Sequence, residues 1–563
     1  MRQVSFVALV AAVAVYSPGG SQAAPLQHGS DDPLTVTTLT GTFTGVFNEE
    51  YPNVREFRSI PYAQPPVGPR RWLPPAALAP SGRHSYARRY PSSCPQYLTK
   101  TPSLWNANIT NFAIGVHGQS LLAGVQAQTS SEDCLKLAIW TPASAANASR
   151  PAGATTSSGA KHDATALLPV ALFIPGGDFQ MGGVDVPYQM PAPLVARRGD
   201  LIVVTHNYRV NIFGFPNAAG LHDQNLGLLD TRMAVEWLHA NIRAFGGDPD
   251  RIVLWGQSAG AVAADIYNYA FYDDPLIAGS YLMSGTAAVA GLPADPAYSN
   301  FSFVARQVGC DFGAPGDPTR DVAAELACMR AVPADLLSNV VGQYAENGTT
   351  PRINFRPVPD ERVYFANFSD RASRGLVAAR PALVSTTANE EAALYPYPVH
   401  NLTAGPYMPA VDKATLAVFV CPAANTTRWR GALSSSSSSS ARRTTYRYQY
   451  AGNFSAVTPY PWMGAYHASD IPMGFGTLAL QPASAIPAFA DAVKATMQDH
   501  VAAYIADPEN GLRNRGWLPD DGSAGGGFLM RFAAGTTLQR SINSLEVDGA
   551  CYGQGVYDNS PQS

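Results

Sequence analysis

The stretch Arg251-Ile-Val-Leu-Trp-Gly-Gln-Ser-Ala-Gly-Ala261 is the part of the sequence that most strongly indicates the fold. An apolar run predicts a buried strand at Arg251–Trp255, and a helical pattern follows over Ala259–Phe271. Between them lies Gly256-Gln-Ser-Ala-Gly260, the Gly-x-Ser-x-Gly pattern of a sharp strand-to-helix turn that exposes a serine. The helix N-terminus adds N–H groups and a positive dipole end. The stretch therefore predicts a nucleophile at Ser258; the alternative is an ordinary turn.

The same alternation of strands and helices extends along the chain. Short apolar runs predict further buried strands at Leu167–Ile174, Leu201–Thr205, Tyr281–Met283, Pro381–Ser385 and Tyr446–Tyr450. Helical patterns cover Leu228–Phe245 and Ala488–Asp507. Alternating elements predict an α/β fold with a large, mostly parallel sheet covered by helices on both faces. Pro151–Thr165 and Ser434–Ser440 are typical of surface loops, and no repeat or boundary divides the core, so we expect one domain over residues 24–563.

Composition excludes several classes of protein. The net charge of −4, with only 14% charged residues, leaves no basic face that could neutralise a row of phosphates, so nucleic acid is not an expected partner. Hydrophobic residues make up 46% of the chain, which suits a large globular core. No Cys-x-x-Cys or His-x-x-x-His pattern indicates a metal, and no cofactor is expected. The oligomeric state stays open.

The N-terminus predicts secretion. Arg2, the apolar run Val4–Val15 and small residues up to Ala23 have the layout of a signal peptide over residues 1–23. No later run is long enough to span a membrane, and the C-terminal residues show no lipid-anchor signal, so an extracellular location is expected. An even number of cysteines, six, suits an oxidising compartment. Candidate glycosylation sites are Asn108, Asn147, Asn300, Asn347, Asn367, Asn401, Asn425 and Asn453.

A nucleophilic serine needs a base and an orienting acid, which in this type of fold follow the serine along the chain. The histidines that follow are His400, His467 and His500. His500 falls within a helical pattern and His400 lies in a Pro-rich loop, whereas His467 stands in a Gly-rich loop after a predicted strand. We therefore predict that His467 is the base.

The remaining parts of the site follow two other predicted strands. Glu390 and Glu391 come after the strand at Pro381–Ser385, and either could orient an imidazole. Ile174-Pro-Gly-Gly-Asp-Phe179 follows the first strand and fits a Gly-rich loop whose N–H groups stabilise an oxyanion; the N–H of Ala259 would complete it. The alternative for this loop is a structural turn.

Several longer motifs together resemble the type-B carboxylesterase/lipase family, which includes cholinesterases and fungal lipases. They are Phe57-Arg-Ser-Ile-Pro-Tyr-Ala-Gln-Pro-Pro-Val-Gly68, Ser131-Glu-Asp-Cys-Leu-Lys-Leu137, Asn207-Tyr-Arg-Val-Asn-Ile-Phe-Gly-Phe215, Phe245-Gly-Gly-Asp-Pro249, the serine turn and the His467 loop. The resemblance implies an α/β-hydrolase fold and a secreted serine carboxylic ester hydrolase with a covalent acyl-enzyme.

The resemblance also implies roles for single residues. Ser258 would be the nucleophile, His467 the base and Glu390 the acid, since Asn389-Glu390 matches the family's acidic motif. The oxyanion would be held by the N–H groups of Gly177, Asp178 and Ala259. Implied disulfides join Cys94 to Cys134, Cys310 to Cys328 and Cys421 to Cys551. Asp178 stands where the family has glycine, and a carboxylate about 4 Å from an oxyanion would oppose it by about 4 kcal/mol at an effective dielectric of 20.

Three questions stay open at this stage. Some proteins with this fold are non-catalytic adhesion or binding domains, which typically lack a triad member; this chain has a candidate for each. The substrate could be a lipid ester, a short acyl ester or a choline ester. The apolar loop between Cys94 and Cys134 is either a lid that opens at a lipid interface or a segment packed permanently on the core.

Overall fold

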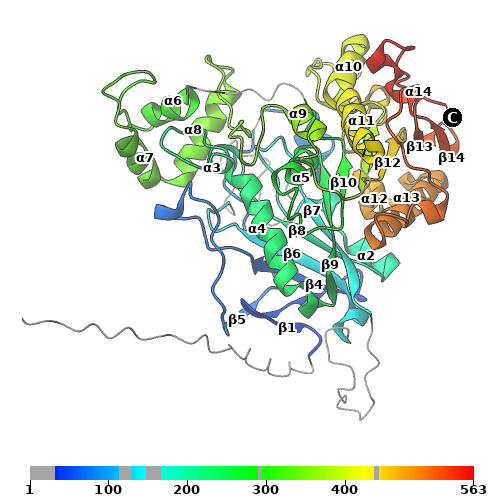
Figure 1. Ribbon diagram of the computed structural model, residues 1–563, viewed down its shortest axis with the longest axis horizontal. Helices are drawn as coiled ribbons and strands as arrows, with labels where there is room; N and C mark the ends of the chain where they lie inside the picture. Colours follow the sequence, from blue (N-terminus) through cyan, green and yellow to red (C-terminus); the bar gives the residue numbers. More distant parts are fainter. Residues whose placement is uncertain are drawn as a thin grey trace, which may run out of the picture.

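A computed structural model describes residues 32–99, 101–112, 130–147, 166–289, 295, 297–436 and 443–562. A large twisted sheet runs through the molecule (Figure 1). Helices α6–α8 gather at one end, whereas α12, α13 and the C-terminus lie at the other (Figure 1). The predicted signal peptide and the predicted loop at 151–165 lie outside the described residues.

The main sheet has 11 strands in the order β14-β13-β12-β11-β10-β9-β7-β8-β6-β4-β3. Neighbouring strands from β8 to β13 are all parallel, and antiparallel strands extend the sheet at both edges. The bounds are β3 Val46–Phe47, β4 Val54–Pro61, β6 Lys136–Pro142, β7 Leu168–Ile174, β8 Ile202–His206, β9 Gly247–Gln257, β10 Gly279–Met283, β11 Ala382–Thr387, β12 Thr445–Tyr450, β13 Phe528–Ala534 and β14 Thr537–Asn543. A small second sheet contains β1 Thr35–Thr38, β2 Gly41–Thr44 and β5 His84–Tyr86.

The predicted parallel core is confirmed. The six predicted buried strands correspond to β7–β12, and the three predicted helical stretches correspond to α4 (Leu226–Asn241), α5 (Ala259–Ala270) and α13 (Ala488–Ala506). The serine tract was expected to be a loop from Ser434, but α11 (Cys421–Ser436) continues into its first residues. The strand pattern did not predict β13, which is parallel to β12, or the antiparallel strands β3, β4, β6 and β14.

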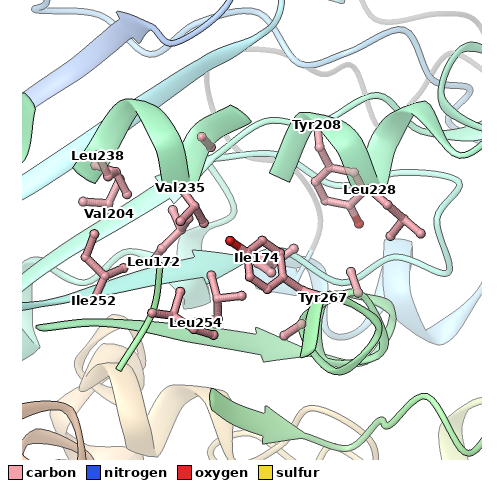
Figure 2. Packing of buried hydrophobic residues seen from close by; sticks show 14 of the residues in the cluster. Leu172, Ile174, Val204, Tyr208, Leu228, Val235, Leu238, Ile252, Leu254 and Tyr267 are labelled. Atoms are coloured by element: carbon pink, nitrogen blue, oxygen red, sulfur yellow. The ribbon is translucent and has the colours of Figure 1, made fainter. Parts of the chain in front are cut away.

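Alternate residues of the central strands face α4 and α5. Leu172 and Ile174 of β7 share one face, because every second side chain of a strand points the same way. They belong to a buried cluster with Ile252 and Leu254 of β9. Figure 2 shows these side chains packed with others from the strands, from α4 and α5 and from a nearby loop: Val204, Tyr208, Leu228, Val235, Leu238 and Tyr267.

The opposite face carries the intervening residues. Ala171 and Phe173 of β7 lie in a second buried cluster with Trp255 of β9. Helices α2 (Ala192–Arg198), α12 (Ile471–Phe475) and α13 contribute to the same cluster. The sheet is therefore covered on both faces, and the loops at the carboxyl ends of its parallel strands meet at one edge.

Three disulfides join the pairs that the family resemblance implies, Cys94–Cys134, Cys310–Cys328 and Cys421–Cys551. Cys310 is buried in the cluster formed by α6 (Ser299–Gln307), α7 (Val322–Ala331) and α8 (Ala334–Glu346). The remaining helices are α1 Leu104–Ala107, α3 Asn211–Gly214, α9 Phe368–Ser373, α10 Met408–Thr415 and α14 Leu545–Asp548. Among the described residues, no helix combines the length and apolar character that a bilayer span requires.

The candidate glycosylation sites differ in exposure. Asn108, Asn347, Asn367, Asn401 and Asn453 are exposed, and Asn425 is half-buried. Asn300 is buried on α6, and its side-chain amide donates a hydrogen bond of 3.0 Å to the carbonyl of Asn354. Because a glycan would be attached at this nitrogen, Asn300 does not fit as an acceptor in this structure. The side chain of Asn147 lies outside the described residues.

A buried ion pair on β12 offers a test of this fold. Arg447 is 1% exposed and donates two hydrogen bonds to Asp548, with an oxygen of Asp520 3.6 Å away. Arg447→Met should lower the free energy of unfolding by about 3–5 kcal/mol, because it leaves two buried carboxylates uncompensated. Urea denaturation measures this loss. Arg374→Met, which removes an exposed pair with Asp370, should change it by less than about 0.5 kcal/mol; equal effects would contradict the buried pair.

Candidate active site

Ser258 stands at the turn between β9 and α5. Its backbone has φ 56° and ψ −127°, a conformation that non-glycine residues rarely adopt. The turn is held by hydrogen bonds from its N–H to the carbonyl of Met283, at 2.8 Å, and from the N–H of Val262 to its carbonyl, at 3.0 Å. Ser258 is partly exposed although its neighbours in the motif are buried. The strained turn thus presents one hydroxyl at the carboxyl edge of the sheet.

Both glycines of the motif are needed because other backbone atoms lie too close to leave room for a side chain. A Cβ on Gly256 would lie 2.2 Å from the carbonyl oxygen of Gly260, and one on Gly260 would lie 1.9 Å from that of Ile174. The second contact packs the start of α5 against the end of β7, where the Gly-rich loop begins. Gly176 in that loop also lies close to the serine turn, since a Cβ on it would lie 3.0 Å from Cβ of Ser258. The predicted oxyanion loop and the predicted nucleophile therefore lie in contact.

Glu390 and His467 form a buried pair. Glu390 is fully buried in a 3-10 turn after β11, and His467 is 5% exposed. His467 Nδ1 lies 2.6 Å from Oε2 of Glu390, and the N–H of Thr387 donates to Oε1 at 2.7 Å. Because a carboxylate only accepts, Nδ1 carries the proton. The other ring nitrogen, Nε2, is then unprotonated and can accept a proton.

The two loops are joined by their backbones as well. Asn389 forms a bridge with Tyr466, and the N–H of His467 donates to the carbonyl of Glu390 at 3.3 Å. The Asn389 side chain accepts from the N–H of Ala465 at 2.9 Å. These contacts fix the distance between the acid and the histidine before any substrate binds.

His467 points toward the serine turn. Its Nε2 lies 3.1 Å from the amide nitrogen of Gln257, the residue before Ser258. An amide N–H donates to Nε2 only if that nitrogen carries its lone pair, which agrees with the proton on Nδ1. The ring of Phe419, in a π-helical turn at Leu416–Val420, packs against the imidazole at a centroid distance of 4.8 Å. The sequence did not predict the contacts of Gln257, Thr387 or Phe419.

The Gly-rich loop presents unused N–H groups. None of the described residues accepts a hydrogen bond from the N–H of Gly177 or Asp178, and Ala259 is the first residue of α5, where N–H groups have no partner within the helix. The loop is fixed by Tyr208, whose hydroxyl donates to the carbonyl of Pro175 at 2.9 Å. Asn211 also holds it, donating its N–H to the carbonyl of Phe179 at 2.7 Å. The positions predicted for oxyanion donors are therefore together beside Ser258.

A second carboxyl group lies behind the histidine. Asp470 is fully buried and accepts a hydrogen bond from the hydroxyl of Tyr448 at 2.9 Å, which in turn pairs with Tyr281 at 2.7 Å. Burial, and then the charge of Glu390, raise the pKa of Asp470 to about 7. In the described part of the chain, no three His, Cys, Asp or Glu side chains converge on a point where they could hold a metal ion.

The other candidate side chains lie elsewhere. His400 is exposed, and Glu391 is half-buried next to Glu390. His500 lies on α13, as its helical pattern predicted, but it is buried between Gln539, at 2.8 Å, and Arg515, at 3.1 Å. Burial lowers the pKa of His500 to about 4. Neither His400 nor His500 joins the group around Ser258.

The first part of the Cys94–Cys134 loop packs against the 3-10 turn at Glu390–Ala393 and the residues that follow it. Leu104 is buried, and its N–H donates to the hydroxyl of Tyr397 at 2.9 Å. The indole N–H of Trp105 donates to the carbonyl of Ala393 at 3.1 Å. These contacts favour a fixed segment up to residue 112. The rest of the predicted lid, residues 113–129, lies outside the described residues.

The fold and this arrangement define an α/β-hydrolase with a serine at a strand-to-helix turn. A comparison with protein families matches residues 32–408 to the carboxylesterase family. The chain belongs to this family, whose members are carboxylic ester hydrolases.

Individual relatives agree with this assignment. A chlorogenic acid esterase of Aspergillus niger is 38% identical over 446 residues, which cover 79% of this chain and 77% of the relative. Secreted lipase 5 of Gibberella zeae is 35% identical over 555 residues, covering 95% of this chain and 97% of the relative. Carboxylesterase 5A of Felis catus is 32% identical over 318 residues, covering 55% of this chain and 51% of the relative.

The raised pKa of Asp470 predicts a dependence of stability on pH. The folded protein keeps the Asp470 proton up to pH about 7, whereas the unfolded chain loses it near about 3.9. The contribution of Asp470 to stability is therefore full below pH about 4 and declines until about 7. Relative to the natural protein, the melting temperature of Asp470→Asn should rise as the pH increases from about 4 to about 7, and the difference should level off above that pH. Thermal melts measure this, and a constant difference between the two proteins would contradict it.

Proposed function

We propose that the protein is a secreted serine carboxylic ester hydrolase in which Ser258, His467 and Glu390 form a catalytic triad. The observation that carries the proposal is the 2.6 Å hydrogen bond between His467 Nδ1 and Glu390, because it leaves the other ring nitrogen unprotonated beside the strained serine turn. Removal of the signal peptide 1–23 would leave residues 24–563 as one catalytic domain. Three disulfides and relatives named secreted lipases support the extracellular location.

The reaction has two halves. His467 Nε2 takes the proton of the Ser258 hydroxyl while Oγ bonds to the ester carbonyl carbon. The carbonyl oxygen becomes an oxyanion held by the N–H groups of Gly177, Asp178 and Ala259. The protonated His467 then gives its proton to the departing alkoxide, which leaves as the alcohol. Water repeats the sequence on the acyl-enzyme, releasing the carboxylic acid and restoring Ser258.

The ester that the enzyme prefers can be tested with a substrate series. One relative is named a chlorogenic acid esterase and another a secreted lipase, so aromatic, short acyl and long acyl esters belong in the series. Rates should be compared below and above the solubility limit of the long acyl esters. A rise above that limit would indicate activation at a lipid interface, as a mobile lid predicts.

Ser258→Ala should lower kcat by about 10⁶-fold while leaving the melting temperature within about 2 °C, because the triad acts as a unit and the hydroxyl is partly exposed. Hydrolysis of p-nitrophenyl butyrate measures the rate. Covalent labelling by a fluorophosphonate, seen in the natural protein and absent in the variant, checks the nucleophile independently. Natural rates in Ser258→Ala would rule out the mechanism; no hydrolysis and no labelling by the natural protein would favour the non-catalytic binding domain.

Glu390 and its neighbour provide a matched pair of variants. Glu390→Gln should lower kcat by about 10³–10⁴-fold, because the amide no longer holds the proton on Nδ1 of His467. Glu391→Gln should lower kcat less than about tenfold, since in the described part of the chain this half-buried side chain forms no hydrogen bond to the imidazole and its loss removes only one partly solvated charge. Steady-state rates on one ester compare the two, and a larger loss for Glu391→Gln would move the acid.

A further inference from the structure

Asp178 is an unusual residue for an oxyanion loop. Its backbone adopts φ 56°, a left-handed conformation that aspartate tolerates better than most side chains. Its N–H is one of the donors in the proposed function, on which this inference rests. Its side chain, however, brings a negative charge to the place where the reaction develops another. This negative charge also acts on Tyr208, whose hydroxyl holds the loop. Burial raises the pKa of Tyr208, and the Asp178 carboxylate raises it further.

An arginine from a distant segment binds this carboxylate. Arg356 donates from Nε to Oδ1 of Asp178 at 3.0 Å and from Nη2 to Oδ2, a two-pronged contact. The Asp178 side chain is 59% exposed and that of Arg356 28%. The carboxylate is thus turned outward, away from the buried serine turn, and is paired with a cation of fixed geometry.

The segment that carries Arg356 is itself fixed at both sides of the arginine. The carbonyl of Phe355 accepts from the side-chain amide of Gln180, in the Gly-rich loop, at 2.7 Å. Val358 exchanges two hydrogen bonds with the side chain of Asn225, at 3.0 and 2.8 Å, at the start of α4. Arg356 therefore reaches Asp178 from a backbone attached both to the loop and to the main helix layer.

We propose that Arg356 is a positioning residue of the oxyanion hole. It holds the Asp178 carboxylate toward solvent and offsets its charge, so that the N–H and not the side chain of Asp178 faces the developing oxyanion. The Gln180 contact keeps the loop in place independently, which means that loss of Arg356 frees the carboxylate without releasing the whole loop. The predicted defect is thus electrostatic and specific to the transition state.

A double-mutant cycle on the full-length enzyme tests this. With p-nitrophenyl butyrate, Arg356→Gln should lower kcat about tenfold, less than the 10²–10³-fold of a lost donor, with KM changed less than about twofold. Asp178→Asn should change kcat less than about tenfold, since it keeps the backbone donor. In Asp178→Asn, adding Arg356→Gln should have an effect below about twofold, because no carboxylate remains to be held. In 1 M NaCl the single variant Arg356→Gln should recover in part, since salt screens an exposed charge.

Arg362→Gln is the matched control, because Arg362 lies on the same segment and pairs with Asp223 instead; it should keep kcat. Equal losses from Arg356→Gln in both backgrounds, or no loss at all, would overturn the proposal. A loss confined to KM or accompanied by a matching fall in melting temperature would also overturn it. Ser258→Ala distinguishes failure of the proposed function from failure of this inference. If hydrolysis by the natural enzyme depends on Ser258 but the double-mutant cycle shows no coupling, only the role of Arg356 is contradicted.

Discussion

The active site depends on one steric contact, the approach of Gly260 at the start of α5 to the carbonyl of Ile174 at the end of β7. No side chain fits between them, because even a Cβ would lie 1.9 Å from that oxygen. The contact sets the first turn of the helix against the loop that follows the strand. The start of the Gly-rich loop and the N-terminus of α5 thereby converge beside Ser258. A parallel sheet with helices on both faces provides the rigid support that this convergence needs.

Glu390 and His467, the proposed acid and base, are held together by a backbone bridge between two loops. Asn389 and Ala465 exchange two hydrogen bonds that join the turn after β11 to the loop after β12, and the N–H of Thr387 donates to the Glu390 carboxylate within that turn. Because β11 and β12 are neighbouring parallel strands, loops far apart in sequence leave the sheet side by side. The imidazole is therefore oriented by contacts that exist without substrate. In the proposed triad, substrate binding then need not contribute energy to bring Glu390 and His467 together.

The sequence predicted the features that depend on residues close together in the chain, namely the buried parallel strands and the short motifs. The β7 strand was predicted at Leu167–Ile174 and is found at Leu168–Ile174, because a strand buried on both faces is a continuous apolar run. β4 was missed since it carries Arg55 and Glu56, which are buried with polar partners and interrupt that run. Ser258 and His467 lie in short motifs that could be recognised. The Arg356–Asp178 pair could not, since it joins residues 178 positions apart with no pattern connecting them.

The two buried carboxyl groups near His467 are distinguished by their hydrogen-bond donors. Glu390 accepts from two N–H groups, those of Thr387 and His467, an environment that suits a charged carboxylate. Asp470 accepts from one tyrosine hydroxyl, and its other oxygen finds no partner among the described residues. Burial and the charge of Glu390 raise the pKa of Asp470 to about 7, so this carboxyl group loses its proton only as the pH approaches neutrality. The two carboxyl groups near the imidazole therefore differ in what binds them: Glu390 is held by the backbone at the end of β11 and by His467, whereas Asp470 is held by a tyrosine hydroxyl.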